Sequence, residues 1–404
     1  MNDKLLAQNK FTVGIGLGIN KEPLQAIKQA TQEARVNLSA GSIDLALVFS
    51  SPDFSYSPLL KTVNDLLGNP PMIGCSSLGI ITNTGIRKHA IAVMLLSLPE
   101  GACVNTACVS EISAKSAYLS GEELGKKLLS GFTSLRRSLS VVFSDGMIKD
   151  SSGFLSGLQE QLGLSFPLVG AAASDNLRFA KTYVYYGQHT ISDAACGIIW
   201  GGKLNFGLGI RHGWKALGKP RQVTRAIGNV VYEIDGASAT NIYEEYFSCN
   251  LENLKKELKR ISIFYPIGIY LPHEKEYLLR NLSAVEDNGS LVFQGNVPEG
   301  SAIRLMIGTK ESCLAATRQA AEEAKKGLGS AGAKFVLVFD SISRYMLLGK
   351  QAGKELEIIK DTFGTQTPIL GFYSLGEQAP LQAIDYMGKA YVHNQTVAVL
   401  AIGS

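Results

Sequence analysis

Several features that mark common classes of protein are absent from this sequence. Among its 404 residues, 39 Lys and Arg nearly balance 35 Asp and Glu, which leaves a formal net charge of +4. No basic run with interleaved aromatic residues is found either. Proteins that bind nucleic acid carry such clusters of positive charge, so we do not expect nucleic acid as a partner.

Long apolar runs are also absent. No run approaches the ~20 residues that a membrane-spanning helix needs. Residues 1–10 carry charges scattered along their length, so they contain no apolar signal-peptide core. We therefore predict a cytoplasmic protein without a membrane span.

Cysteine and histidine are sparse and widely spaced. The six cysteines include no C-x-x-C pair, so the sequence indicates neither a zinc site nor a disulfide framework. The five histidines show no H-x-x-x-H or H-E-x-x-H spacing, which argues against a metal site made by protein ligands alone. A single imidazole can still bind haem iron in an apolar pocket, and the histidines ranked for that role are His212 and His189.

The chain does contain a unit that occurs three times. Each copy is an apolar strand, a helix and a second apolar strand that ends at a glycine and a polar loop. The three loops read Gly74-Cys-Ser-Ser-Leu-Gly79, Gly170-Ala-Ala-Ala-Ser-Asp175 and Gly371-Phe-Tyr-Ser-Leu-Gly-Glu377. The repetition predicts an α/β fold of layered domains, with mixed or antiparallel sheets built from repeated strand-helix-strand units.

Other local patterns complete the predicted organisation. Residues 181–215 read as three strands in a meander, and 261–270 as a strand of a second sheet. Ser120 and Glu123 have the spacing of a capping box at a helix start, and Thr309 can cap a helix over 311–326. Length alone suggests two or three domains, and we divide the chain into regions 1–245 and 246–404.

The glycine loops supply the candidate site residues. Cys75 could be a nucleophile if backbone amides activate its thiol, but cysteine at a strand end is more often a small apolar residue. Arg344, with Tyr373 and Glu377 in the companion loop, could bind a carboxylate or could form a salt bridge between loops. Asp175 ends the second loop and joins this predicted ligand-binding set. Gly14-x-Gly16-x-Gly18 resembles a phosphate loop only weakly.

Taken in order, these motifs resemble the FIST domain family over nearly the whole chain, from about Leu45 to Ala401. Further stretches that carry the resemblance are His212-Gly-Trp214, Val223-Thr224 with Gly228-Asn229, Asp235-Gly-Ala237, Val297-Pro-Glu-Gly-Ser301 and His393-Asn-Gln-Thr396. The chain departs from the family at Ile80, where relatives often carry an acidic residue, and at Ser341, where they often carry cysteine. If the residues at these two positions contact the ligand in relatives, we expect this chain to bind a different ligand.

The resemblance implies a sensory protein that binds a small ligand and is not an enzyme. It is similar to the stand-alone haem-binding, nitric-oxide-sensing FIST proteins, which implies haem as a cofactor and a separate histidine kinase or other signalling protein as partner. One alternative is an amino-acid sensor in which Arg344 holds the carboxylate. The other is a hydrolase that uses Cys75.

Overall fold

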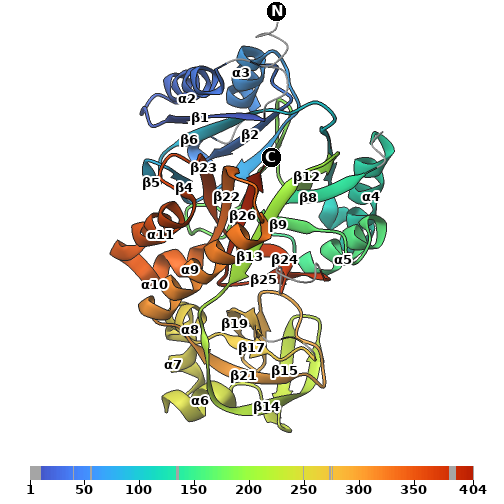
Figure 1. Cartoon of the computed structure of the whole chain (residues 1–404). Helices are drawn as coiled ribbons and strands as arrows, with labels where there is room; N and C mark the ends of the chain where they lie inside the picture. The colour runs from blue at the N-terminus through green and yellow to red at the C-terminus, as the bar shows by residue number, and fades with distance from the viewer. Residues whose placement is uncertain are drawn as a thin grey trace, which may run out of the picture.

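The computed structural model describes residues 11–39, 41–54, 57–132, 136–248, 250–272, 274, 276–381 and 388–403. These residues form three sheets of six described strands each and one smaller mixed unit (Figure 1). The expectation about residues 1–10 lies outside the described residues, as do Cys249 and His273. The mixed α/β fold class is confirmed.

The three predicted copies are confirmed as three strand-helix-strand units whose two strands pair in parallel. The first is β2 (Leu45–Ser50), α3 (Ser57–Leu67) and β3 (Met72–Ser76). The second is β8 (Arg137–Ser144), α5 (Ser151–Leu162) and β9 (Leu168–Ala172). The third is β22 (Ala333–Ser341), α10 (Ile342–Leu348), α11 (Gly353–Phe363) and β23 (Ile369–Ser374).

Each copy also contains two more strands, which extend its sheet, and one more helix, which packs on that sheet. An outer strand and a helix precede each unit, and a later strand inserts between the outer strand and the unit. In chain order these elements are β1 (Thr12–Gly18), α2 (Pro23–Leu38) and β6 (Ile91–Ser97); β7 (Cys103–Ser110), α4 (Ala117–Ser130) and β12 (Ala194–Gly201); and β13 (Asn205–Arg211), α9 (Lys310–Gly327) and β26 (Val397–Gly403).

A cyclic exchange of hairpins completes the three sheets. The hairpin that follows the third strand of one copy pairs with the sheet of another, so no copy completes its own sheet. The first copy's hairpin joins the third sheet, the second copy's joins the first, and the third copy's joins the second. The hairpins are β4 (Ile80–Thr82) with β5 (Gly85–Arg87), β10 (Val184–Tyr186) with β11 (His189–Ile191), and β24 (Glu377–Pro380) with β25 (Ala390–His393).

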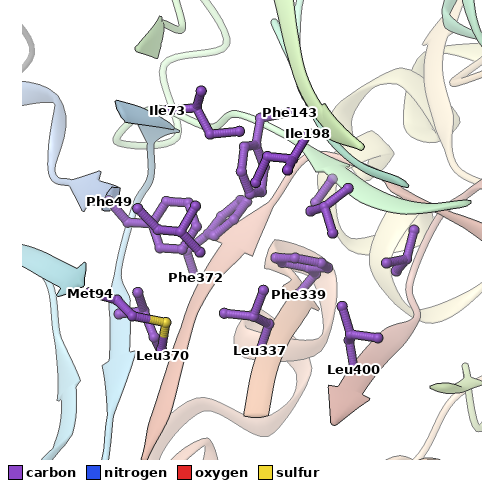
Figure 2. Close-up of a cluster of buried hydrophobic side chains, with 14 of the residues drawn as sticks. Phe49, Ile73, Met94, Phe143, Ile198, Leu337, Phe339, Leu370, Phe372 and Leu400 are labelled. Carbon is purple, nitrogen blue, oxygen red and sulfur yellow. The ribbon is translucent and has the colours of Figure 1, made fainter. Parts of the chain in front are cut away.

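The three sheets share one apolar core, and the helices cover their outer faces. Phe49, Phe143 and Phe339 occupy the same position in the three units, and their rings meet around Phe372 (Figure 2). The ring centroids of Phe49 and Phe143 lie 5.2 Å apart, and those of Phe143 and Phe339 lie 5.8 Å apart. Edge-on aromatic contacts at these distances stabilise a core beyond the area they bury.

Glycines let the outer helices approach the sheets. A Cβ added at Gly14, Gly16 or Gly18 would lie about 2 Å from a backbone carbonyl oxygen of α2, namely that of Ala34, Ala30 or Ala26. Such contacts are too short for any side chain, so these glycines are needed for close packing of a helix on a strand. Gly14-x-Gly16-x-Gly18 therefore belongs to strand β1 and packs against α2, and it does not form a phosphate-binding loop.

A smaller unit is inserted between β13 and α9. Seven of its eight described strands form one continuous path, and the eighth pairs with one of these beside the path. Helices α6 (Asn241–Phe247), α7 (Leu251–Lys256) and α8 (Leu258–Phe264) pack on this sheet around a separate apolar core (Figure 1). The strands are β14 (Lys215–Ile227), β15 (Val230–Ile234), β16 (Ala237–Ser238), β17 (Ile267–Ile269), β18 (Leu278–Arg280), β19 (Leu282–Val285), β20 (Leu291–Phe293) and β21 (Ala302–Ile307). We call it the inserted domain, and the three sheets with their helices the body.

Three local predictions are wrong. The strands β10, β12 and β13 of the expected meander over 181–215 do not pair with one another. Instead they belong to all three sheets of the body, because the hairpins are exchanged between sheets. Helix α4 begins at Ala117, so Ser120 lies inside it and donates to the Ser116 carbonyl at 3.1 Å. Residues 261–264 of the strand expected over 261–270 belong to helix α8, and only Ile267–Ile269 is strand. The predicted Thr309 cap is confirmed, since its hydroxyl accepts from Ser312 N at 3.1 Å.

Candidate functional site

The three glycine loops meet where the parallel strands end. Ser77 Oγ donates to the Tyr373 carbonyl at 2.8 Å, and Ser174 N donates to the Ser76 carbonyl at 3.0 Å. Leu78 N in turn donates to Ser174 Oγ at 3.0 Å. These residues are buried, and their side chains and backbones hydrogen-bond the three loops together. The centre of this junction is therefore structural, and any ligand site lies at its margin.

A cleft lies at that margin, between the body and the inserted domain. Its larger cavity has a volume of about 460 Å³ and is formed by α8 and β19 on one side and by α10 and the third loop on the other. Apolar side chains dominate its walls: Leu177, Phe179, Leu258, Ile263, Leu282, Ile342, Met346 and Leu375. Ligand sites are commonly such apolar cavities with a few fixed polar groups at a domain interface.

A smaller cavity of about 210 Å³ adjoins the larger one. Four residues, Phe179, Ser283, Gln294 and Leu375, line both. The smaller cavity is more polar, with Asp145, Lys149, Asn229, Gln378 and Asn394 in its walls. Together the two form one cleft with an apolar and a polar compartment.

Two more open hollows, of about 600 and 650 Å³, lie near residues 35–70 and 42–104. Both are lined mainly by loop residues of the body at the far ends of the strands. Among the described residues that line these two hollows, none has a buried polar side-chain atom without a hydrogen-bond partner.

The cleft contains such atoms. Asn281 is 6% exposed, and no described group donates to its Oδ1. Gln378 Oε1, in the wall of the smaller cavity, is likewise buried without a described partner, while its Nε2 donates to Ser144 Oγ at 2.9 Å. A buried carbonyl without a donor costs about 1–3 kcal/mol, so each compartment offers a place for a ligand N–H or O–H.

Asp175 shapes the wall of the cleft and does not face it as a free group. Its carboxylate accepts from the backbone N–H of Arg178 and Phe179 at 3.1 Å and of Ala180 at 2.9 Å. The loop that it holds carries Phe179, which has φ 51°, is 50% exposed and lines both cavities. Asp175 therefore holds the loop that carries Phe179.

Glu377 is a buried acid one residue away from the cleft wall. Ser374 Oγ, in the wall of the larger cavity, donates to Glu377 Oε1, and Thr396 Oγ1 donates to Oε2 at 2.6 Å. Burial raises the pKa of Glu377 to about 7, although these hydrogen bonds favour the ionised form. The carboxyl group therefore changes its protonation near neutral pH.

This gives a pH-dependent stability with a defined sign. Between pH 4.5, the usual pKa, and about 7, the folded chain holds a proton on Glu377 that the unfolded chain has lost. The free energy of unfolding should therefore fall as pH rises through this range, by on the order of 3 kcal/mol. Glu377→Gln should flatten the profile, measured by urea unfolding from pH 4.5 to 8, whereas the exposed Glu257→Gln should not. An unchanged slope in Glu377→Gln would show that another group titrates.

Arg344 lies inside the body, where it forms salt bridges with Asp340 and Glu355. It is 0% exposed. Its Nε donates to Asp340 Oδ1 at 3.0 Å, its Nη1 donates to the His212 carbonyl at 2.7 Å, and its Nη2 donates to Glu355 Oε1. Burial and the neighbouring Glu355 carboxylate raise the pKa of Asp340 well above its usual value. A ligand carboxylate would have to displace one of these buried partners.

Tyr373 packs beside this network. Its side chain is 1% exposed, and its ring meets that of Tyr345 at 4.8 Å between centroids. Burial, with the neighbouring Asp340 carboxyl, raises the pKa of its hydroxyl well above the usual value. Tyr373 is not among the residues that line the two cavities, whereas the next residue, Ser374, is.

Cys75 is part of the shared core of the body. It is 0% exposed, and its backbone pairs with Phe49 and Val184. Burial raises the pKa of its thiol well above the usual value, which is the opposite of an activated cysteine. The geometry gives the hydrolase alternative no activated thiol at this position.

Neither of the two histidines ranked as a ligand for haem iron lines the cleft. His212 is 5% exposed, its Nδ1 accepts from Trp214 N at 2.9 Å, and its Nε2 lies 3.2 Å from Glu276 Oε2. His189 is exposed on the edge strand β11. No described residue lining the two cavities is histidine or cysteine. The described residues that line these two cavities therefore offer haem iron no imidazole or thiolate ligand.

Sequence reasoning missed the residues that define the cleft. Asn281, Gln294 and Phe179 lie in short connections between strands, where single polar or aromatic residues carry no periodic signal. Asn229 and Asn394 do belong to stretches that carry the family resemblance, and both line the smaller cavity. Those stretches were the available signal for the cleft.

Fold and cleft thus define an α/β protein with a binding cavity between a three-sheet body and an inserted domain. The chain belongs to the FIST family: models of the FIST N domain and the FIST C domain match residues 44–237 and 239–380. FIST domains are generally small-ligand sensory domains of signalling proteins, so the sensory class predicted from sequence is confirmed at this level.

Among proteins of known sequence, the chain is similar to the uncharacterized protein MJ1623 of Methanocaldococcus jannaschii. The two are 26% identical over 310 residues, which cover 71% of this chain and 58% of that protein. The match therefore spans less than two thirds of the relative's length.

Two solved structures of cyanuric acid hydrolases were also found. The one from A. caulinodans is 8% identical with a TM-score of 0.41, and covers 98% of this chain and 100% of that chain. The other is 9% identical with a TM-score of 0.36, and covers 97% and 99%. Within the described ranges, no helix is long and apolar enough to cross a membrane.

Proposed function

We propose that this chain is a sensory protein that binds a small molecule in the cleft between the body and the inserted domain. The observation that carries the proposal is the buried Asn281 Oδ1, which lacks a described donor and belongs to the wall of a cavity of about 460 Å³. A ligand that donates to this atom would remove the cost of leaving it unpaired.

Binding at this place would bear on the contact between the two parts of the chain. Asn281 Nδ2 of the inserted domain donates to Ser343 Oγ of α10 at 3.3 Å, and Arg280 Nη1 donates to the Val392 carbonyl of β25 at 2.9 Å. Gln395 Nε2 donates to the Ser262 carbonyl of α8 at 2.8 Å. A ligand touching both sides would favour one arrangement of these contacts, which a signalling partner could read. The sequence resemblance suggests a histidine kinase as that partner.

Free amino acids are the first ligands to test. Lys259 lies at the rim of the larger cavity and is exposed, so it can offer a cation to a ligand carboxylate in place of the buried Arg344. The apolar walls suit an aliphatic side chain.

A thermal-shift screen of the twenty amino acids tests the proposal. A ligand present at 100 times its Kd should stabilise the fold by about 2.7 kcal/mol, because it binds only the folded chain. We expect at least one amino acid with an aliphatic side chain to raise the Tm in a saturable manner. Hemin should give no stoichiometric Soret band with the purified chain. Such a band would support a haem-based sensor and contradict the proposal of an amino-acid ligand in the cleft.

A further inference from the structure

The larger cavity contains a pair of carboxamides held in a fixed arrangement. Asn281 Nδ2 donates to Gln294 Oε1 at 3.2 Å and to Ser343 Oγ at 3.3 Å, so both of its N–H groups are used. The backbones of the two residues are joined as well, since Gln294 N donates to the Asn281 carbonyl at 2.9 Å. Asn281 N in turn donates to Asn394 Oδ1 at 3.1 Å.

This pairing leaves one acceptor and one donor unused. Asn281 Oδ1 is buried and receives no hydrogen bond, and no described group accepts from Nε2 of the half-buried Gln294. Rotating both carboxamides by 180° would exchange the two outer groups and would again leave one acceptor and one donor. The complementarity of the pair therefore does not depend on how the two amides are oriented.

We infer that the cleft recognises an amide group of its ligand, which pairs with the outer atoms of Asn281 and Gln294 while an apolar segment lies against Leu177, Ile263 and Met346. A neutral amide supplies an N–H for Asn281 Oδ1 and a C=O for Gln294 Nε2. An ionised carboxylate has no N–H or O–H to donate. The inference deepens the proposed function and rests on it, because it places the ligand in the same cleft.

The apolar part of the ligand follows from the rest of the wall. Leu177, Ile263, Ile342 and Met346 line the same cavity as the amide pair, and the exposed residue Phe179 lines both this cavity and the smaller one. Covering these side chains with a short alkyl chain gains roughly 0.8 kcal/mol per buried CH₂. The preferred ligand is therefore an aliphatic amide, and the free aliphatic amino acids of the screen, which share only its apolar part, should bind more weakly than their amides.

Three probes of equal chain length separate the head groups: hexanamide, hexanoate and 1-hexanol. Ligand-observed NMR titration of the full chain should give a Kd for hexanamide at least tenfold lower than for either of the others. Gln294→Glu, which replaces the outer donor by an acceptor, should reduce that preference to threefold or less. Asn288→Asp makes the same charge change at an exposed turn of the inserted domain and should leave it intact.

Equal affinity for the three probes, an unchanged preference in Gln294→Glu, or no saturable binding of any probe would overturn the amide assignment. These failures are distinguishable from failure of the cleft itself. Equal binding that disappears when the cleft is blocked would keep the ligand site and remove only the amide, whereas the amino-acid screen decides the proposed function independently.

Discussion

Gly170→Ala is expected to destabilise the chain by more than about 4 kcal/mol, a large part of the roughly 5–15 kcal/mol by which an ordinary protein is stable. A Cβ at this position would lie 2.1 Å from the carbonyl oxygen of Val142 on the neighbouring strand. That atom is backbone in the middle of a sheet, so it cannot move aside without breaking the strand pairing. Gly74 and Gly371 face Val48 and Val338 in the same way in the other two copies.

Circular dichroism and urea unfolding of the purified variant provide the measurement. Gly353→Ala is the matched control, because no heavy atom lies within 4 Å of an added Cβ there. The control should stay within about 1 kcal/mol of wild type, since Gly353 opens helix α11 and alanine favours helix. A Gly170→Ala variant as stable as this control would show that the close approach of Gly170 to the Val142 carbonyl is not needed for the paired strands.

Arg344→Met is expected to cost about 3–5 kcal/mol, because it leaves two buried carboxyl groups without their guanidinium. Asp340 and Glu355 both bind Arg344, and they are 1% and 3% exposed. Neutralising both partners in the triple variant Arg344→Met, Asp340→Asn, Glu355→Gln should recover part of the loss. Chemical denaturation measures each free energy of unfolding.

An exposed pair provides the comparison. Arg260 Nη1 lies 3.3 Å from Glu257 Oε2 at the surface, and Arg260→Ala should change the stability by less than about 1 kcal/mol. If Arg344→Met were as mild as Arg260→Ala but abolished ligand binding, Arg344 would be a ligand residue and the buried network would not explain it.

The sequence predicted the elements of the body better than their assembly. The three strand-helix-strand copies follow from local apolar periodicity, and so they could be found without the structure. The exchange of hairpins could not, because nothing in the local pattern of β4 or β10 says which sheet will accept it. The same limit produced the wrong meander over 181–215.

The candidate site divides in the same way. Glu377 and Asp175 were selected because they follow glycines at strand ends, and the structure places both beside the cleft wall. Whether Arg344 meets a ligand or an internal carboxylate depends on Glu355 of α11, which sequence spacing could not place. Asn281 and Gln294 were not predicted as site residues, because their role arises only when they pair within the inserted domain and Asn281 contacts α10.

The most direct test of the central claim is isothermal titration of the amino acid that stabilises most in the screen into a chain whose cleft is blocked. Ser283 is exposed on β19 and lines both cavities, so Ser283→Trp should fill the cleft without disturbing a core. Ala216→Trp adds the same ring to an exposed strand of the inserted domain outside the cavities. The account predicts that Ser283→Trp weakens binding at least tenfold and that Ala216→Trp leaves it unchanged. Equal affinity in the two variants would place the ligand elsewhere and contradict the account.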